Sequence, residues 1–351
     1  MTTTLVIRLS SLGDVAIAIP VLYSIANRYP DDHFLMLTQS AWQSLFINKP
    51  SNLTVFPVDT KGKHKGMKGM IRLLRELSHA VPEKEIKVAD LHGVIRSFLM
   101  DCYFRFKGFP VAVIDKGREE KQKLVRRKRK ILQPVKTSID RYRQVFEKLG
   151  YDSSLCFNGL FSEKPPKEQI RIGIAPFAKH QGKTYPLAQM EEVVRRLNEM
   201  PDLQIVLWGS KQEREYLGNW AAKYGNVTSV AGQMTLQEEL LLMNQMDLMV
   251  SMDSANMHLA SLVNTPVVSI WGATHPYAGF YGFNQDESNT VQTDLPCRPC
   301  SIFGNKSCYR GDYACLKQIM PDMVLEKINA KIHIFSANIS IFAFCKKYFV
   351  R

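Results

Sequence analysis

The stretch LVIRLSSLGDVAIAIP, residues 5–20, decides the fold. A short apolar strand stops at two serines, and Asp14 then opens an apolar helical pattern. The stretch LMVSMDSANMHLA, residues 248–260, repeats this order in the second half, with Asp253 after the strand. Because a helix N-terminus presents unpaired N–H groups and the positive end of a dipole, it suits an anion. Two such turns predict two facing α/β domains with a ligand between them.

Strand-like and helical patterns alternate through most of the 351 residues. In the first half we expect strands at 5–9, 33–38, 53–58, 86–91 and 111–114, and helices at 15–28, 67–77 and 139–149. In the second half we expect strands at 170–175, 203–208, 248–251, 267–271 and 290–293, and helices at 187–199, 212–224, 236–244 and 256–262. This alternation predicts doubly wound parallel sheets, whose ligands bind beyond the carboxyl ends of the strands. A Pro-rich charged linker at residues 162–167 predicts domains at 1–162 and 168–351.

The net charge of +13 is concentrated in the first half of the chain. Residues 116–148 contain 13 Lys or Arg and 4 Asp or Glu, and residues 61–75 contain six Lys or Arg and no acidic side chain. This concentration predicts a surface for an anionic partner, the alternative being solvated helix faces and a basic loop.

The N-terminal residues do not form a signal-peptide pattern, because Arg8 and two serines interrupt the apolar run. No apolar run approaches the length of about 20 residues that spans a bilayer. We therefore expect a cytoplasmic protein whose seven cysteines are reduced. The Phe- and Ile-rich residues 332–350 are expected to pack on the body as a final helix or strand, with contact to a membrane surface as the alternative.

Three segments carry candidate chemistry, and each has a structural alternative. Asp14 is placed to act as a general base or to cap a helix. The loop at residues 176–186 contains Lys183 and Thr184 and could hold a pyrophosphate, or could be a surface loop, since it lacks the G-x-x-x-x-G-K pattern. The segment at residues 253–258 could bind phosphate or be an ordinary capped helix.

Four cysteines form a C-x2-C-x7-C-x6-C cluster, namely Cys297, Cys300, Cys308 and Cys315. Four thiolates suit tetrahedral zinc, but this spacing matches no zinc ribbon or finger. A structural metal, reduced thiols that pack a loop, and a disulfide therefore remain open.

Several other classes of protein are disfavoured. No G-x-G-x-x-G follows a strand, as a dinucleotide oxidoreductase needs, and no Ser-His-Asp or H-E-x-x-H signature is present. A basic nucleic-acid-binding protein with a zinc-stabilised loop is the alternative from a different class. Against it, the basic residues are not interleaved with aromatic side chains, as a stacking platform requires.

Together these segments resemble the heptosyltransferases of glycosyltransferase family 9, enzymes of lipopolysaccharide core assembly. The resemblance covers residues 5 to about 319 and rests on motifs at residues 10–15, 90–97, 140–142, 183–186, 208–213, 253–258 and 297–315. It implies the GT-B fold, two Rossmann-like domains that face each other across a cleft. The sequence departs from the family at Ala255, where glycine is usual, and at Tyr185, where tryptophan is usual.

The resemblance also implies roles for individual residues. Asp14 matches the proposed catalytic base, and Arg96 and Arg141 match basic positions of the acceptor side. Lys183 matches the lysine at the donor phosphates, and Glu213 matches the residue at the ribose. The full implied donor-binding set is Lys183, Thr184, Glu213, Asp253, Ser254 and His258.

We therefore expect an inverting transferase that moves heptose from ADP-heptose to a lipopolysaccharide core acceptor, with another nucleotide sugar as the alternative. No cofactor is expected, because Lys183 and the helix start at Asp253 would stabilise the leaving diphosphate without a bound metal. A structural zinc at the cysteines stays open. The basic clusters are expected to hold a phosphorylated, lipid-linked acceptor through peripheral contact with the inner membrane face. No nucleic-acid partner is expected.

Overall fold

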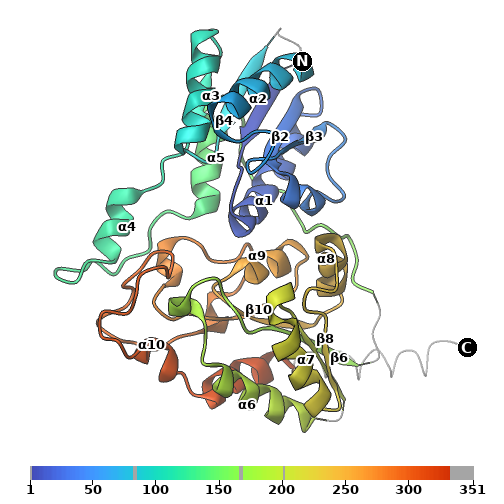
Figure 1. Cartoon of the computed structure of the whole chain (residues 1–351), viewed down its shortest axis with the longest axis vertical. Helices are drawn as coiled ribbons and strands as arrows, with labels where there is room; N and C mark the ends of the chain where they lie inside the picture. The colour runs from blue at the N-terminus through green and yellow to red at the C-terminus, as the bar shows by residue number, and fades with distance from the viewer. Residues whose placement is uncertain (1, 82–84, 166–168, 201, 333–351) are drawn as a thin grey trace, which may run out of the picture. The chain divides into compact units, whose positions relative to one another are not determined.

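The chain divides into two compact units (Figure 1). A computed structural model describes residues 2–81, 85–165, 169–200 and 202–332. Unit 1 comprises Met1–Arg118 and Val135–Leu160, and unit 2 comprises Glu119–Pro134 and Phe161–Arg351. The predicted domain boundaries place residues 119–134 in the first domain, whereas these residues pack with unit 2.

Unit 1 contains a five-stranded sheet in the order β3-β2-β1-β4-β5, and every strand pair in it is parallel. Its strands are β1 (Thr3–Ile7), β2 (His33–Gln39), β3 (Leu53–Val58), β4 (Ile86–Asp90) and β5 (Val111–Val113). The central strand β1 is buried along its whole length, as a strand with neighbours on both sides and helices on both faces should be.

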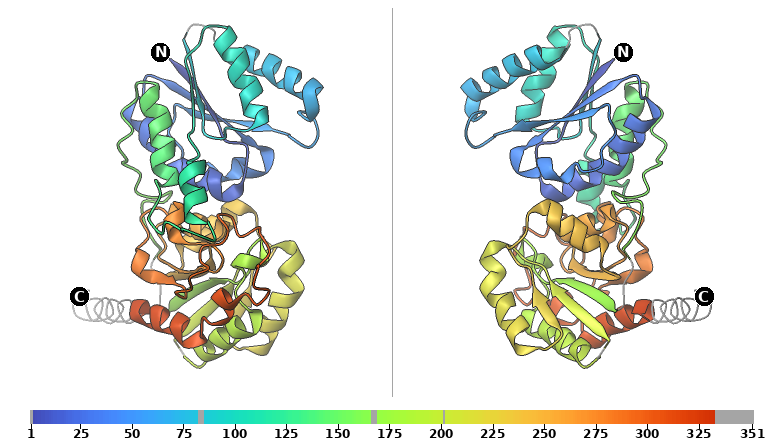
Figure 2. Two further views of the ribbon diagram at one scale, coloured as in Figure 1. Left: turned by 90° about the vertical axis from the view of Figure 1, so that its left-hand side faces the viewer. Right: turned by 90° about the vertical axis from the view of Figure 1, so that its right-hand side faces the viewer.

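Helices cover both faces of this sheet, with α1 and α5 on one face and α2 and α3 on the other (Figure 2). The helical segments of unit 1 are α1 (Leu12–Arg28), η1 (Ser40–Leu45), α2 (Gly66–Ala80), α3 (Ile95–Phe106) and α5 (Ser138–Lys148). Leu73 of α2 and Met100 of α3 form one core with Leu5 and Ile7 of β1. The short helix α4 (Arg118–Leu124) leads from unit 1 into the segment that packs with unit 2.

Unit 2 contains a six-stranded sheet in the order β11-β10-β9-β6-β7-β8, again with parallel pairs throughout. Its strands are β6 (Ile170–Ala175), β7 (Leu203–Leu207), β8 (Val227–Ser229), β9 (Leu248–Met252), β10 (Val267–Ile270) and β11 (Thr290–Val291). The central strands β6 and β9 are apolar over almost every residue, which matches their burial on both faces.

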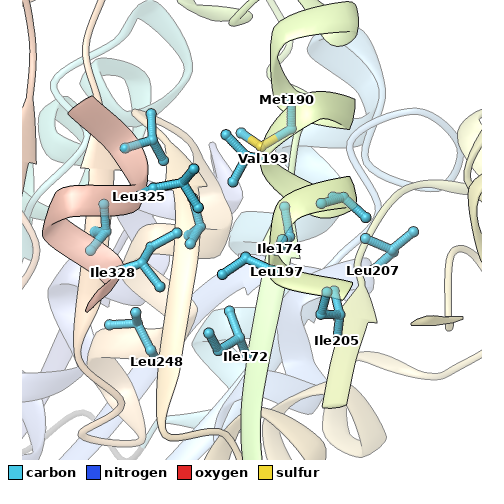
Figure 3. Close-up of a cluster of buried hydrophobic side chains, with 14 of the residues drawn as sticks. Ile172, Ile174, Met190, Val193, Leu197, Ile205, Leu207, Leu248, Leu325 and Ile328 are labelled. Atoms are coloured by element: carbon cyan, nitrogen blue, oxygen red, sulfur yellow. The ribbon is translucent and has the colours of Figure 1, made fainter. Parts of the chain in front are cut away.

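The core of unit 2 lies between its sheet and the helices that cover it. Those helical segments are η2 (Gln181–Lys183), α6 (Leu187–Asn198), η3 (Lys211–Glu213), α7 (Arg214–Lys223), α8 (Leu236–Asn244), α9 (Ala255–Leu262), η4 (Pro276–Ala278), η5 (Glu287–Asn289), α10 (Ala314–Lys317) and a helix at 321–332. Figure 3 shows Ile172 and Ile174 of β6 packed with Met190 of α6 and Ile328 of the helix at 321–332. Burial of each such aliphatic side chain contributes about 1.5–3 kcal/mol to the free energy of folding.

The predicted fold of two parallel α/β sheets is confirmed, and every predicted strand and helix that lies among the described residues is found, with ends displaced by up to three residues. The sequence pattern did not predict α3, because Ile95, Phe98 and Phe106 on this helix are exposed, so that apolar residues are not confined to its core face. It also missed β8, which has only three residues. Beyond Ile332, the prediction for residues 332–350 lies outside the described residues. None of the described helices is both long and apolar enough to cross a membrane.

Candidate functional site

Each sheet has a point where the direction of winding reverses. In unit 1 the chain runs from β1 outward to β3 and then returns to β4, on the other side of β1. In unit 2 it runs from β6 outward to β8 and then returns to β9, on the other side of β6. Ligands of open α/β sheets bind at such switch points. The loops after β1 and β4, and those after β6 and β9, are therefore the candidate sites of the two units.

Asp14 lies in the first turn of α1, just after the loop that follows β1. Its Oδ2 accepts hydrogen bonds from the backbone N (3.1 Å) and Oγ (2.8 Å) of Ser11, and lies 2.6 Å from Nη2 of Arg8. The bond from the Ser11 N–H means that Asp14 does cap α1, the structural alternative. All three contacts fall on Oδ2 and 25% of the side chain is exposed, so Oδ1 is left to accept a proton from a ligand.

Arg8 fixes both the position and the charge of Asp14. Its Nη1 donates a hydrogen bond to the Leu91 carbonyl (2.7 Å), and its guanidinium lies 5.8 Å from the centre of the Tyr142 ring. The Tyr142 hydroxyl in turn donates to the carbonyl of Asp14 (3.4 Å). Burial acts to raise the pKa of Asp14, but the charge of Arg8 and the hydrogen bonds from Ser11 outweigh burial and hold that pKa below its ordinary value. Asp14 is therefore ionised at neutral pH.

A cavity of about 700 Å³ lies at the switch point of unit 1. Its wall includes Leu9 and Ser10 after β1 and the turn at residues 92–96 after β4. The charged residues that line it are Arg96, Arg105, Lys116, Arg118, Asp90 and Asp101. His92, also in the wall, stays neutral because burial, followed by the charges of Arg8 and Lys116, lowers its pKa to about 3. With four cationic and two acidic side chains, this cavity suits an anionic ligand.

The two arginines predicted for the acceptor side have different environments. Arg96 lies in the first turn of α3 and lines the cavity. Arg141 on α5 is only 2% exposed, and its guanidinium donates to the carbonyls of Lys136 (3.2 Å) and Asp115 (3.0 Å). Arg141 therefore holds together the segments that contain Lys136 and Asp115.

In unit 2, Lys183 and Asp253 form an ion pair across the switch point. Lys183 ends η2 in the loop after β6, Asp253 follows β9, and Nζ and Oδ2 are 2.8 Å apart. The two side chains are 16% and 4% exposed. Because an ammonium group has three donors, Lys183 can keep Asp253 and still bind phosphate oxygens. The adjacent N-terminus of α9 adds N–H groups that suit the same anion.

Glycines allow the loops around Lys183 to pack closely. A Cβ on Gly304 would lie 2.5 Å from Cγ of Lys183, and a Cβ on Gly272 would lie 2.6 Å from the carbonyl oxygen of Gly182. The Gly182 carbonyl accepts a hydrogen bond from the Ala273 N–H (2.8 Å). The segment at residues 297–315, which contains Gly304, therefore contacts the aliphatic part of Lys183 directly.

The other predicted donor-binding residues follow β6, β7 and β9, which are neighbours in the sheet of unit 2. The Thr184 hydroxyl donates to the Ala178 carbonyl (3.2 Å) and so holds the loop after β6. Glu213, after β7, accepts a hydrogen bond from the Ser210 N–H. Ser254 is the N-cap residue of α9, and His258 is buried within that helix. All six predicted residues thus belong to loops or helix starts at the carboxyl ends of β6, β7 and β9.

The four clustered cysteines, Cys297, Cys300, Cys308 and Cys315, are free thiols that line a single cavity of about 10 Å³. Burial raises the pKa of Cys315 to about 11, even though Arg298 acts against it. In the part of the chain that the structure describes, no group of three or more His, Cys, Asp or Glu side chains is placed to hold a metal ion. Within the described residues, no disulfide joins any of these four cysteines.

The basic segment at residues 119–134 packs on this cysteine-rich loop. Lys130 Nζ donates to the carbonyls of Cys297 (2.8 Å), Arg298 (2.9 Å) and Pro299 (3.0 Å). Arg127 lies 4.3 Å from the centre of the Tyr309 ring. Part of the basic surface predicted for an anionic partner is therefore used to hold unit 2 together.

Two residues that control Asp14 were given no role from the sequence, namely Arg8 and Tyr142. A signal for Arg8 was available, since a charged side chain directly after a buried strand needs a partner. Tyr142 lies in the motif at residues 140–142, but its contact with Asp14 could not be predicted, because only the fold brings α5 against the start of α1. A third residue, Asp101, lines the cavity from within α3, an element that was itself missed.

Comparison with known proteins shows that this chain is similar to heptosyltransferases. The model of glycosyltransferase family 9 (heptosyltransferase) matches residues 105–307. Lipopolysaccharide heptosyltransferase 1 of Pseudomonas aeruginosa is 26% identical over 313 residues, which cover 84% of this chain and 85% of the relative. The solved structure of the family 9 glycosyltransferase from Veillonella parvula has a TM-score of 0.71 at 20% identity, covering 94% of this chain and 97% of that chain. The E. coli heptosyltransferase WaaC with ADP has a TM-score of 0.66 at 18% identity, covering 94% and 100%.

Proposed function

Because the chain belongs to glycosyltransferase family 9, the heptosyltransferases, we propose that it transfers a heptose from ADP-heptose to a lipopolysaccharide core acceptor. The predicted family, GT-B fold and enzyme class are thereby confirmed. The observation that carries the assignment of roles is the environment of Asp14. It is an ionised carboxylate with one oxygen free of hydrogen bonds from the described residues, in the first turn after a switch-point loop whose cavity is basic.

The donor is proposed to bind unit 2 at the carboxyl ends of β6, β7 and β9. Lys183 and the N-terminus of α9 would hold the diphosphate, and Glu213 would hold the ribose. Asp253 keeps the Lys183 ammonium at this place before the donor arrives. Tyr185, which departs from the family pattern, is fully buried and donates its hydroxyl to the Ile319 carbonyl (2.8 Å), so this departure affects the core of unit 2.

The proposed reaction inverts the configuration at the anomeric carbon. Asp14 Oδ1 takes the proton of an acceptor hydroxyl, and the hydroxyl oxygen attacks the anomeric carbon on the face opposite the diphosphate. The bond between that carbon and the diphosphate oxygen breaks, and ADP leaves. Lys183 and the N–H groups of α9 stabilise the charge that develops on the leaving diphosphate.

The acceptor is proposed to bind the cavity of unit 1, where Arg96 is one of four basic side chains. A phosphorylated glycan suits this charge. Helix α2 begins after the exposed Lys65 and carries Met67 and Ile71, which are 64% and 55% exposed. Exposed apolar side chains beside basic ones are typical of surfaces that rest on anionic lipid, so we also propose peripheral membrane contact for a lipid-linked acceptor.

Nucleotide selectivity tests the donor assignment. Calorimetry with ADP, UDP and GDP should give the tightest binding for ADP, and transfer assays should consume ADP-heptose with release of ADP. Tightest binding of UDP or GDP would support the alternative, a transferase that uses another nucleotide sugar. Binding of none of the three, together with a salt-dependent shift on RNA or DNA, would support a nucleic-acid-binding protein instead.

The pH profile tests the link between Arg8 and Asp14. A base must be deprotonated to act, and Arg8 helps to hold the pKa of Asp14 below its ordinary value. Arg8→Gln removes that charge, so the pKa of Asp14 rises and the acid limb of kcat/KM moves to higher pH. Arg8→Lys keeps the charge and should leave the acid limb close to that of the native enzyme. An unshifted limb in Arg8→Gln would mean that another group acts as the base.

A further inference from the structure

Two buried carboxyl groups meet at the cavity of unit 1. Asp90 ends β4 and is 0% exposed, and Asp101 lies in α3 and is 1% exposed. Both line the cavity, and their side chains are hydrogen-bonded to each other. The reaction proposed above uses neither of them.

The hydrogen bonds of Asp90 decide which carboxyl group carries the proton. Asp90 Oδ1 accepts from the backbone N–H of His92 (2.7 Å), and both of its oxygens accept from the N–H of Gly93 (2.9 and 3.0 Å). Asp90 is therefore an acceptor in every one of these bonds. Two carboxylates in contact repel each other, and a hydrogen bond between them needs one proton. The proton consequently belongs to Asp101, which donates to Asp90.

The charged groups around Asp101 come from four segments. Arg105, one turn further along α3, acts to lower the pKa of Asp101. Arg96, Lys116 and Arg118 line the same cavity, and Arg8 interacts with the Asp90 charge. His92 is neutral. Burial first, and then the charge and hydrogen bond of Asp90, outweigh Arg105 and raise the pKa of Asp101 to about 7.

We propose that Asp101 is a positioning residue for the anionic acceptor. As a neutral acid it donates to Asp90, and Asp90 orders the turn at residues 92–94 that forms the cavity wall. When Asp101 loses its proton, a second negative charge enters a cavity built for an anion and the hydrogen bond to Asp90 is lost. The cavity then binds its ligand less tightly. This inference rests on the proposed function, because it takes the acceptor as the ligand of this cavity.

Acceptor kinetics over a range of pH test the consequence. The KM for the acceptor should rise roughly tenfold from about pH 6 to about pH 8 in the native enzyme, as one added charge near an anion predicts. Asp101→Asn keeps a hydrogen-bond donor but cannot ionise, so its KM should lack this rise. The ratio of the two KM values cancels the titration of phosphates on the acceptor, which is common to both. Asp31→Asn, an equal change of charge at an exposed position, should follow the native profile. A ratio that stays constant with pH overturns the proposal.

Infrared difference spectroscopy tests the proton on Asp101 without any transfer assay. The native protein should show the C=O stretching band of a carboxylic acid that disappears as the pH rises through about 7. Burial also raises the pKa of Glu239 to about 7, so Glu239 contributes a band of its own in every variant. The band should therefore be smaller in Asp101→Asn than in the native protein and unchanged in Asp31→Asn. A native protein without this band, or a band of full size in Asp101→Asn, overturns the proposal. If the band titrates as expected while ADP-heptose is not used, the proposed function fails and the proton assignment stands.

Discussion

Asp14→Asn is expected to lower kcat for heptosyl transfer by about 10²–10⁴-fold, the usual contribution of a general base. The amide has the size and shape of the carboxylate, and its oxygen can still accept the hydrogen bond from the Ser11 N–H that caps α1. It cannot take a proton from the acceptor hydroxyl. Because the donor is proposed to bind unit 2, the affinity for ADP measured by calorimetry should stay unchanged.

Ser11→Ala separates the structural role of Asp14 from its chemical role. This variant removes the hydroxyl that donates to Asp14 Oδ2 (2.8 Å) but keeps the carboxylate and its ion pair with Arg8. It should lose some thermal stability and little kcat. If Ser11→Ala lowers kcat as much as Asp14→Asn does, or if Asp14→Asn also loses ADP binding, then Asp14 acts mainly by holding the fold.

Local sequence patterns were sufficient to predict the fold. The stretch at residues 5–20 contains the strand, the turn and the apolar helix that start a doubly wound sheet, and all three signals come from neighbouring residues. Helix α3 was missed because its pattern is not purely that of a core helix. Ile95 is 84% and Phe106 is 94% exposed, so apolar residues occur on the solvent side as well as on the core side.

The candidate site was predicted residue by residue, but its contacts were not. Asp14 and Lys183 were named singly, while several contacts that hold their side chains in place come from distant parts of the chain. Arg8 is anchored by a carbonyl 83 residues away, and Asp14 is contacted by a hydroxyl 128 residues away. Arg141 illustrates the same limit, since its burial depends on loops that precede its helix and that no helical periodicity describes.

The charged side chains of the two candidate sites are held by different kinds of contact. In unit 1, neighbouring groups set the protonation of two acidic side chains. Ser11 and Arg8 keep Asp14 ionised, and Asp90 favours the protonated form of Asp101. Asp14 can therefore accept a proton at neutral pH, whereas Asp101 is mostly neutral only below about pH 7. In unit 2 the ion pair with Asp253 holds Lys183, the cation that is proposed to bind the diphosphate of the donor. Removing one member of that pair should therefore affect folding and binding together.

Lys183→Ala is expected to weaken ADP binding by about 100-fold, because it removes a charge-assisted contact to the diphosphate. It should also lower the free energy of unfolding. Asp253 is only 4% exposed and would be left as a buried carboxylate without its partner. Breaking a fully buried pair costs about 3–5 kcal/mol, and the 16% exposure of Lys183 should reduce this to roughly 2 kcal/mol. Calorimetry with ADP and denaturant unfolding measure the two effects separately.

The double variant Lys183→Ala/Asp253→Ala distinguishes the two roles of this lysine. With both charges gone, no unpaired carboxylate remains, so much of the lost stability should return. ADP binding should not return, because the cation that faces the diphosphate is still missing. Lys179→Ala, an exposed position in the same loop, controls for the loss of one positive charge and should change neither quantity appreciably. Recovery of ADP affinity in the double variant would show that Lys183 serves only to neutralise Asp253, and the diphosphate would then have to be held by the N-terminus of α9 without it.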